Sequence, residues 1–375
     1  MRPSGTKAVP MHLVMGAGGW CYIRDVVDVQ QRVAPELTST IVLRYNIMRH
    51  VFFTQPVGRR TLAIRIGESE RVIRREEDAL REAGLVVVSS DGIRLSRDGE
   101  DILWDLKDYV RSLLGMGELE DVLRRGFALE HVVVVGGDSD VDQGAKREMA
   151  RAAARVLREV IADGDVLAVT GGTTMAAIAD EAVSAGGKRD VVVVPARGSL
   201  GEDVEKQADT VAAAFAKKLG GAYRLLNLPD DLGEESAASV LAEPRIREVL
   251  ETIRSARVVL HGIGTALDMA RRRNMPAEKV REIQSRGAVG EAFGFYFDSG
   301  GRVVYATSSL GLRLTDLRRV ERVISVGGGG RKAEAMAAVL RNGFAHVLVT
   351  DEGAARRMQT MILGSKEEWE VNPAR

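Results

Sequence analysis

The C-terminal part of the chain is constrained most by one repeating pattern, in which short apolar runs alternate with amphipathic segments. From Leu129 onward, Val-rich runs recur, and between most of them the apolar residues take helical spacing. Runs that are apolar at nearly every position predict strands buried on both faces, as in parallel sheets covered by helices. We therefore predict a Rossmann-like α/β domain. Strands are expected at 131–135, 166–169, 191–194, 224–228, 258–260, 293–297, 323–326 and 347–350, and helices at 145–161, 174–185, 204–219 and 332–341.

The expected carboxyl ends of these strands carry residue types that bind anions. Ligands of parallel sheets bind at such ends. The run at 166–169 leads into a turn made of Gly171, Gly172, Thr173 and Thr174. Glycines let backbone amides turn toward a ligand, and threonines add hydroxyl donors at a helix N-terminus. Other ends carry Arg197 in VVVVPARG, the turn of VLHGIG, and Lys332 in VISVGGGGRK. Each alone is typical of an ordinary turn, but together they predict a rim with several anion sites.

The sequence lacks the motifs of cofactor-dependent and hydrolytic enzymes. The glycines of HGIG have Leu267 where a dinucleotide fingerprint needs a third glycine, and GGGGRKA is no ATP-binding P-loop. No acid is paired with a base, and His261 is interpreted as a structural donor. With Cys21 as the sole cysteine and no HExxH spacing, Cys-pair and zincin-type metal sites are excluded. We predict no enzyme activity, no cofactor and no metal.

Composition limits the partners of the chain. Its 375 residues carry a formal net charge of zero, so no global basic field attracts nucleic acid or an anionic membrane. Any DNA contact must therefore come from local basic patches, and we expect several copies of the protein to bind together. No apolar run is long enough to span a membrane. A single cysteine fits a reducing cytoplasm, which is the expected location.

The segment from Pro56 to Leu85, PVGRRTLAIRIGESERVIRREEDALREAGL, reads as two short helices with a tight turn at Gly67. A further helix is expected before it at 40–53. The following VVVSSDGIRL reads as two strands joined through an Asp-Gly turn, a strong hairpin signal. A hairpin directly after two such helices predicts a winged helix-turn-helix. In that motif the second helix lies in the DNA major groove.

The second of these helices separates its faces clearly. At 100° per residue, Arg71, Arg74 and Arg75 fall opposite the apolar arc, and arginine suits bidentate contact with guanine or phosphate. Ser69 is a good N-cap. Glu76 falls inside the apolar arc, so we expect it to pair with Arg44 or Arg65. The predicted DNA-contact residues are Arg59, Arg60, Ser69, Glu70, Arg71, Arg74 and Arg75. A solvated helix face is the alternative, because acids nearly balance arginines here.

The domain boundary is expected near Gly115 and Gly117, which interrupt the helical spacing of 97–114. We predict a disordered leader at 1–21 and a DNA-binding domain with a connecting helix at 22–114. Residues 118–375 would form the effector-binding and oligomerisation domain.

These motifs resemble the SorC family of sugar-responsive bacterial regulators over nearly the whole chain from about Asp25. The resemblance rests on the helix-turn-helix segment and on TGGTTM, VVPARGSLGEDVEKQADTVAAAFAKKLGG, LHGIG, GAVGEAFGFYFD, SVGGGGRKAEAMAAVLRNG and HVLVTDEGAA, in the family's order and spacing. It implies an effector domain related to ribose-phosphate isomerases and glucosamine-phosphate deaminases that has lost catalysis. It also implies a repressor of central glycolytic genes that binds operator DNA and responds to fructose 1,6-bisphosphate.

The resemblance also implies roles for single residues. Gly172, Thr173 and Thr174, beside Gly171 and helped by Lys332, would hold one phosphate. Arg197 and Arg272 would hold the other end, while Gln207 and Glu291 would meet hydroxyls. Because Arg271 and Arg273 flank Arg272, a slip of one position remains open.

The expected mechanism is loss of avidity. A homodimer or homotetramer would bind repeated half-sites, and the effector would rearrange the subunits so that the half-sites are no longer engaged together. Two alternatives stay open: a phosphosugar isomerase or deaminase with an accessory DNA domain, and a regulator that senses a monophosphate of a pentose, deoxyribose or polyol.

Overall fold

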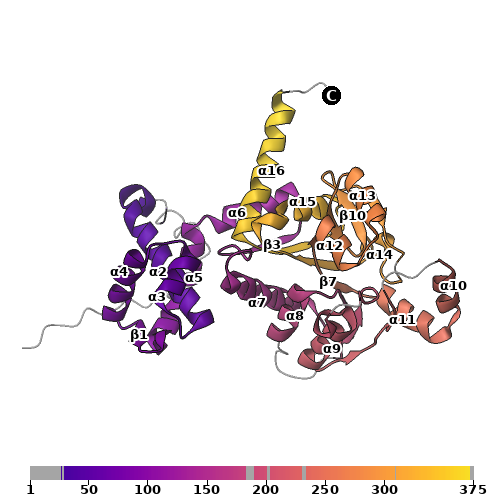
Figure 1. Ribbon diagram of the computed structural model, residues 1–375, viewed down its shortest axis with the longest axis horizontal. Helices are drawn as coiled ribbons and strands as arrows, with labels where there is room; N and C mark the ends of the chain where they lie inside the picture. Colours follow the sequence, from indigo (N-terminus) through magenta and orange to yellow (C-terminus); the bar gives the residue numbers. More distant parts are fainter. Residues whose placement is uncertain are drawn as a thin grey trace, which may run out of the picture. The chain divides into compact units, whose positions relative to one another are not determined.

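The computed structural model describes residues 27, 29–182, 190–200, 203–229, 234–308 and 310–371 (Figure 1). The predicted leader at 1–21 lies outside these residues. Backbone contacts divide the chain into two compact units, Met1–Gly117 and Glu118–Arg375, which are described separately.

The N-terminal unit is a winged helix-turn-helix, as predicted. Its elements are α2 (Pro35–Thr54), α3 (Arg59–Ile66), α4 (Glu70–Glu82), β1 (Val86–Ser89), β2 (Gly92–Leu95) and α5 (Arg97–Leu113). Gly67 ends α3 with a left-handed φ of 79°, which glycine adopts without steric cost. Ser69 then caps α4 by accepting a hydrogen bond from the Val72 N–H at 3.3 Å. The hairpin β1–β2 forms the wing.

The core of this unit is formed by the apolar residues that helical spacing places on one face of each helix. The fully buried side chains include Ile47, Met48, Leu62, Ile73, Ile93 and Leu103. Glu76 is only 3% exposed among them, and its Oε2 lies 2.8 Å from Arg44 Nε, which confirms the expected pairing with Arg44. A charge inside the apolar arc is tolerated because an arginine from α2 reaches it.

The C-terminal unit is built on a parallel sheet of seven strands in the order β3-β13-β12-β7-β4-β5-β6. These strands are β3 (His131–Val135), β4 (Val166–Val169), β5 (Val192–Pro195), β6 (Ala222–Tyr223), β7 (Val258–Gly262), β12 (Arg322–Val326) and β13 (Val347–Asp351). The larger helices are α6 (Met116–Gly126), α7 (Gln143–Val160), α8 (Thr173–Glu181), α9 (Ala208–Leu219), α10 (Glu234–Ala242), α11 (Pro244–Arg254), α15 (Ala333–Arg341) and α16 (Glu352–Val371). In Figure 1, α7, α8 and α9 lie along one face of the sheet, with α16 on the other. The α/β architecture predicted from the alternating pattern is confirmed.

A second sheet is antiparallel, with strand order β11-β10-β9-β8. It comprises β8 (Gly264–Thr265), β9 (Ala288–Ala292), β10 (Phe295–Asp298) and β11 (Val303–Ala306), and it is accompanied by α12 (Ala266–Arg272), α13 (Ala277–Ser285) and α14 (Leu314–Leu317). The apolar run at 293–297 was expected in the parallel sheet, and that placement is wrong. Phe293 and Gly294 take positive φ values of 54° and 80° and form a tight turn, so β10 pairs back onto β9.

Two smaller predictions also differ from the structure. Residues 224–228 form no strand, because the backbone N–H groups of Leu226 and Asn227 donate to the Asp209 carboxylate instead of a ladder. The helix expected at 204–219 is split into the 3₁₀ turn η2 (Val204–Lys206) and α9, with Gln207 extended between them.

Candidate functional site

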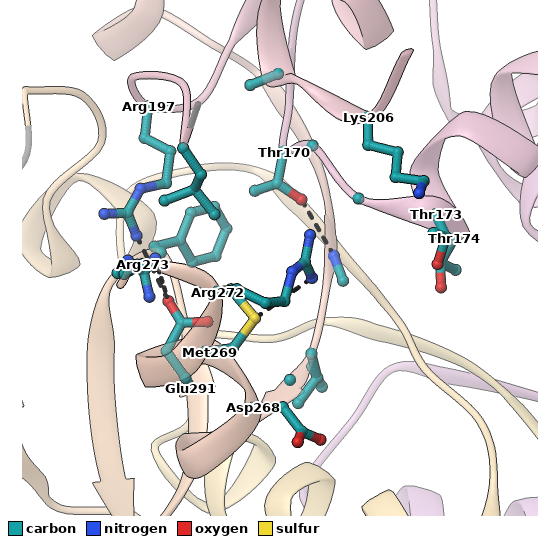
Figure 2. A pocket seen from close by; sticks show the side chains of 18 of the residues that line it. Thr170, Thr173, Thr174, Arg197, Lys206, Asp268, Met269, Arg272, Arg273 and Glu291 are labelled. Carbon is teal, nitrogen blue, oxygen red and sulfur yellow. Dashed lines mark hydrogen bonds and ion pairs between the residues drawn. The ribbon is translucent and has the colours of Figure 1, made fainter. Parts of the chain in front are cut away.

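A cavity of about 520 Å³ opens at the carboxyl ends of β4, β5 and β7. Because these three parallel strands are neighbours, their ends meet at one edge of the sheet, and the β8–α12–β9 segment supplies another wall. All nine residues predicted for the effector line this cavity: Gly171, Gly172, Thr173, Thr174, Arg197, Gln207, Arg272, Glu291 and Lys332. Figure 2 shows the side chains of many of the lining residues.

One side of the cavity is the N-terminus of α8. Its N-cap is Gly172, with φ of 110°, so no side chain caps the helix. Gly171 permits a close backbone approach, since a Cβ there would lie 2.4 Å from the Lys206 carbonyl oxygen. The helix dipole and the first-turn amides favour an anion at this end, and Thr173 and Thr174 add hydroxyl donors.

The opposite side holds a buried triad of charges around Glu291, a residue of β9 that is only 4% exposed. Its Oε1 accepts hydrogen bonds from Arg273 Nη2 at 3.0 Å and from the Gly294 N–H at 2.5 Å, and Arg197 Nη1 lies 3.5 Å away. All of these donors converge on one carboxylate oxygen. In Figure 2 the other oxygen is turned toward Met269, where it can accept from a ligand hydroxyl.

The three consecutive arginines at the end of α12 take different positions. Arg271 is largely exposed and its guanidinium lies 3.8 Å from Asp268. Arg272 extends into the cavity, where its Nη1 lies 3.6 Å from Met269 Sδ and its guanidinium faces Thr170 (Figure 2). Arg273 is nearly buried against Glu291 and Tyr296. Of the three, Arg272 is therefore placed to meet an anion inside the cavity.

Lys332 adds positive charge beside Arg272. Burial lowers the pKa of its ammonium group, and repulsion by Lys146 and Arg272 lowers it further. Within the described part of the chain, Lys332 forms no ion pair. An arriving phosphate would relieve this repulsion, which favours anion binding on electrostatic grounds.

The glycine loop at 327–330 belongs to the predicted rim of anion sites, but several of its backbone amides donate to carboxylates of this chain. The Gly329 N–H donates to Asp351 at 2.8 Å, the Gly330 N–H to Asp138 at 3.3 Å, and the Arg331 N–H to Asp140 at 2.9 Å. Carboxylates of this chain thus occupy the amides that a phosphate would need. The sheet order explains the meeting, because β3 and β12 flank β13 and their following loops converge.

His261 is fully buried in the core, where its ring bonds to a neighbouring strand. Its Nε2 is 2.7 Å from Ser325 Oγ, and burial lowers its pKa to about 4. The ring is therefore neutral at physiological pH, which agrees with a structural role. The lining residues that sequence reasoning missed include Thr170, Lys206, Asp268 and Met269, and Arg273, which stayed open as a one-position slip from Arg272, lines the cavity as well. Several directly adjoin predicted residues, and that adjacency was the only signal for them.

The predicted DNA-contact residues of the N-terminal unit fall into two groups. Arg60, Arg71 and Arg74 are exposed, as are Ser69, which caps α4, and Glu70 in its first turn. Arg59 and Arg75 pair with buried carboxylates of α4. Arg59 pairs with Glu77, which is 1% exposed, and Arg75 lies 2.7 Å from Glu76, although the Arg75 side chain is itself 72% exposed. The exposed residues, Arg75 included, are best placed for base or phosphate contact.

The parts of the chain that the structure describes contain no helix able to cross a membrane. In the same residues, no group of histidine, cysteine and acidic side chains could hold a metal ion.

Comparison with known proteins gives two family matches. Residues 111–359 match the family described as "Putative sugar-binding domain", and residues 41–110 match the "CggR N-terminal DNA binding domain". The chain is 41% identical over 337 residues to the central glycolytic genes regulator of Priestia megaterium, covering 90% of this chain and 98% of that protein. It is 40% identical over 336 residues to the central glycolytic genes regulator of Bacillus subtilis, covering 90% and 99%.

Solved structures agree. A SorC family transcriptional regulator from Enterococcus faecalis is 38% identical with a TM-score of 0.61, covering 64% of this chain and 99% of that one. The full-length sorbitol operon regulator SorC from Klebsiella pneumoniae shares the fold at 19% identity, with a TM-score of 0.61 and coverage of 87% and 99%. The chain therefore belongs to the SorC family of sugar-responsive bacterial transcriptional regulators.

Proposed function

We propose that this protein is a cytoplasmic repressor of central glycolytic genes whose cooperative binding to operator DNA is relieved by fructose 1,6-bisphosphate. The observation that carries the proposal is the cavity. It combines an uncapped helix N-terminus, a cluster of cations and a buried carboxylate, in a chain that also carries a winged helix-turn-helix. The names of the relatives from Priestia megaterium and Bacillus subtilis support the choice of glycolytic genes.

The charges of the cavity support a phosphorylated sugar as the effector. The N-terminus of α8, with Thr173 and Thr174, would bind one phosphate. Arg272 and Lys332 would bind a second negative group. Glu291 repels phosphate but accepts well from hydroxyls, so its presence in the wall opposite α8 favours a sugar over an inorganic anion. Two cationic regions favour a bisphosphate over a monophosphate.

The proposed mechanism acts through assembly. The protein works as a homodimer or homotetramer that binds repeated half-sites through the exposed arginines of α3 and α4. Each DNA-binding unit has a nearly neutral helix-turn-helix, so single-unit affinity is low and simultaneous binding of several units supplies avidity. An effector that favours a different subunit arrangement reduces that avidity without touching the DNA-contact residues.

An enzymatic function finds no support at the cavity. Two arginines clamp Glu291, and His261 is neutral and bonded to Ser325, so neither is placed as an acid or base for turnover. We propose that the chain is not an enzyme. Assays of isomerase and deaminase turnover with sugar phosphates test this directly, and measurable turnover would contradict it.

A thermal-shift screen over phosphorylated sugars tests the effector class. Bound ligand stabilises the folded state by mass action, so the tightest ligand should raise the unfolding temperature most at equal concentration. Fructose 1,6-bisphosphate should lead the series, followed by hexose monophosphates, with unphosphorylated fructose inactive. A larger shift from a pentose, deoxyribose or polyol monophosphate would keep the regulator and replace the effector.

A further inference from the structure

Lys206 lies on η2, directly before Gln207, and lines the effector cavity. Its backbone oxygen accepts a hydrogen bond of 2.8 Å from the Gly172 N–H. The approach is possible because residue 171 is glycine, where a Cβ would clash with that same oxygen. The backbone of η2 is therefore held against the turn that begins α8.

The side chain of Lys206 extends toward the same turn. Figure 2 shows its ammonium group directed toward the hydroxyls of Thr173 and Thr174. An ammonium group beside the positive end of a helix dipole is electrostatically unfavourable unless an anion lies between them. Helix N-terminus, hydroxyls and ammonium together present donors to one point, which suits the several oxygens of a phosphate.

Asp203, the residue directly before η2, forms an ion pair with Lys206. Lys206 Nζ lies 2.5 Å from Asp203 Oδ2, and this hydrogen bond lowers the pKa of the Asp203 carboxyl. The pair is open to water, because the Asp203 side chain is 71% exposed and that of Lys206 is 35% exposed. Exposed ion pairs contribute little to stability, so a more highly charged anion can displace the carboxylate.

We propose that Lys206 is a phosphate ligand of the effector, and that Asp203 competes with the phosphate for its ammonium group. This inference rests on the proposed function, because it assigns further roles in the same cavity. On binding, the ammonium group exchanges one carboxylate for a phosphate that also meets the N-terminus of α8. Asp203 thereby sets the affinity for the effector without contacting it.

The test compares two substitutions that remove opposite partners of this ion pair. If the pair were only structural, both substitutions would change the affinity for the effector in the same way. Full-length Lys206→Met and Asp203→Asn are titrated with fructose 1,6-bisphosphate by calorimetry. Lys206→Met should bind about tenfold more weakly, since a charge-assisted hydrogen bond is lost. Asp203→Asn should bind about two- to fivefold more tightly, because an exposed competing ion pair is removed. Lys217→Met, an exposed lysine of α9 outside the cavity, is the matched control and should bind as the wild type does.

The direction of the two changes decides the outcome. Opposite changes in affinity support competition, whereas unchanged or equally weakened binding in both variants overturns it. Thermal unfolding without ligand shows whether each variant is folded, and Asp203→Asn keeps the proposal testable if Lys206→Met is not. If the wild-type protein binds no phosphorylated sugar at all, the proposed function fails first. If it binds but neither variant differs from it, only the inference about Lys206 and Asp203 fails.

Discussion

Replacing Arg59 with alanine should destabilise the helix-turn-helix before it affects any DNA contact. Glu77 of α4 is 1% exposed, and both of its oxygens receive hydrogen bonds from Arg59, one of them at 2.7 Å. Removal of the arginine leaves a buried carboxylate without this partner. Breaking a buried pair costs about 3–5 kcal/mol, and we take about 2 kcal/mol because Arg59 is itself 38% exposed and water reaches the site.

Hydrogen exchange in the full-length protein measures this effect locally. A loss of about 2 kcal/mol in opening free energy corresponds to roughly thirtyfold faster amide exchange in α3 and α4. Arg60→Ala is the matched control, because Arg60 is the exposed neighbour. It should weaken DNA binding while exchange stays at the wild-type rate.

A double substitution separates lost charge pairing from lost packing. Arg59→Met combined with Glu77→Leu removes both charges and keeps apolar volume, so protection should return toward the wild-type level. Wild-type exchange in Arg59→Ala would refute the reasoning and return Arg59 to the group of DNA-contact residues.

Three further predictions concern the cavity and the titrating groups. Gly171→Ala should weaken binding of fructose 1,6-bisphosphate by roughly tenfold in calorimetry, because the new Cβ would lie 2.4 Å from a backbone oxygen of η2 and would shift the residues that bind the ligand by tenths of an ångström. The control Gly117→Ala, whose Cβ would have no atom within 4 Å, should bind the effector with wild-type affinity. Burial would raise the pKa of Glu76, but Arg44 and Arg75 outweigh this effect and hold the pKa below its usual 4.5. The stabilisation is therefore complete above that pH and is lost as pH falls through the lower folded value. In calorimetry, the unfolding temperature of the helix-turn-helix unit should fall in acid, and Glu76→Gln should flatten this dependence. The pKa of the Lys332 ammonium group is lowered from 10.5, and a bound phosphate should raise it again, so effector binding should be accompanied by proton uptake and the affinity should fall as pH rises toward 10.5. Calorimetric titrations in buffers of different ionisation heat measure the proton uptake. Lys332→Met should abolish both the proton uptake and the pH dependence of the affinity.

The sequence was sufficient for features that depend on local spacing. The amphipathic pattern of α4, the Asp-Gly turn of the wing and the strand-to-helix turn at Gly171 and Gly172 are each encoded within about fifteen residues. Adjacent parallel strands then bring their ends together, which is why all the residues predicted for the effector line one cavity.

Features that depend on distant partners were not predictable in this way. Asp138 and Asp140 satisfy a loop that lies about 190 residues later in the chain, and only the order β3-β13-β12 brings them together. Similarly, the bond between Arg59 and Glu77 joins two helices, so the sequence predicted Arg59 as a DNA-contact residue and did not indicate its buried partner. An apolar run such as 293–297 indicates a strand but cannot indicate its partner strand.

The central claim is that a sugar bisphosphate relieves cooperative operator binding. The direct test is a titration of the full-length protein onto an operator that carries two half-sites, selected from genomic fragments, with and without fructose 1,6-bisphosphate. A one-half-site fragment is titrated in parallel. The account predicts that the effector lowers affinity and cooperativity on two half-sites while one-half-site binding changes little. Unchanged affinity and cooperativity on two half-sites would contradict it.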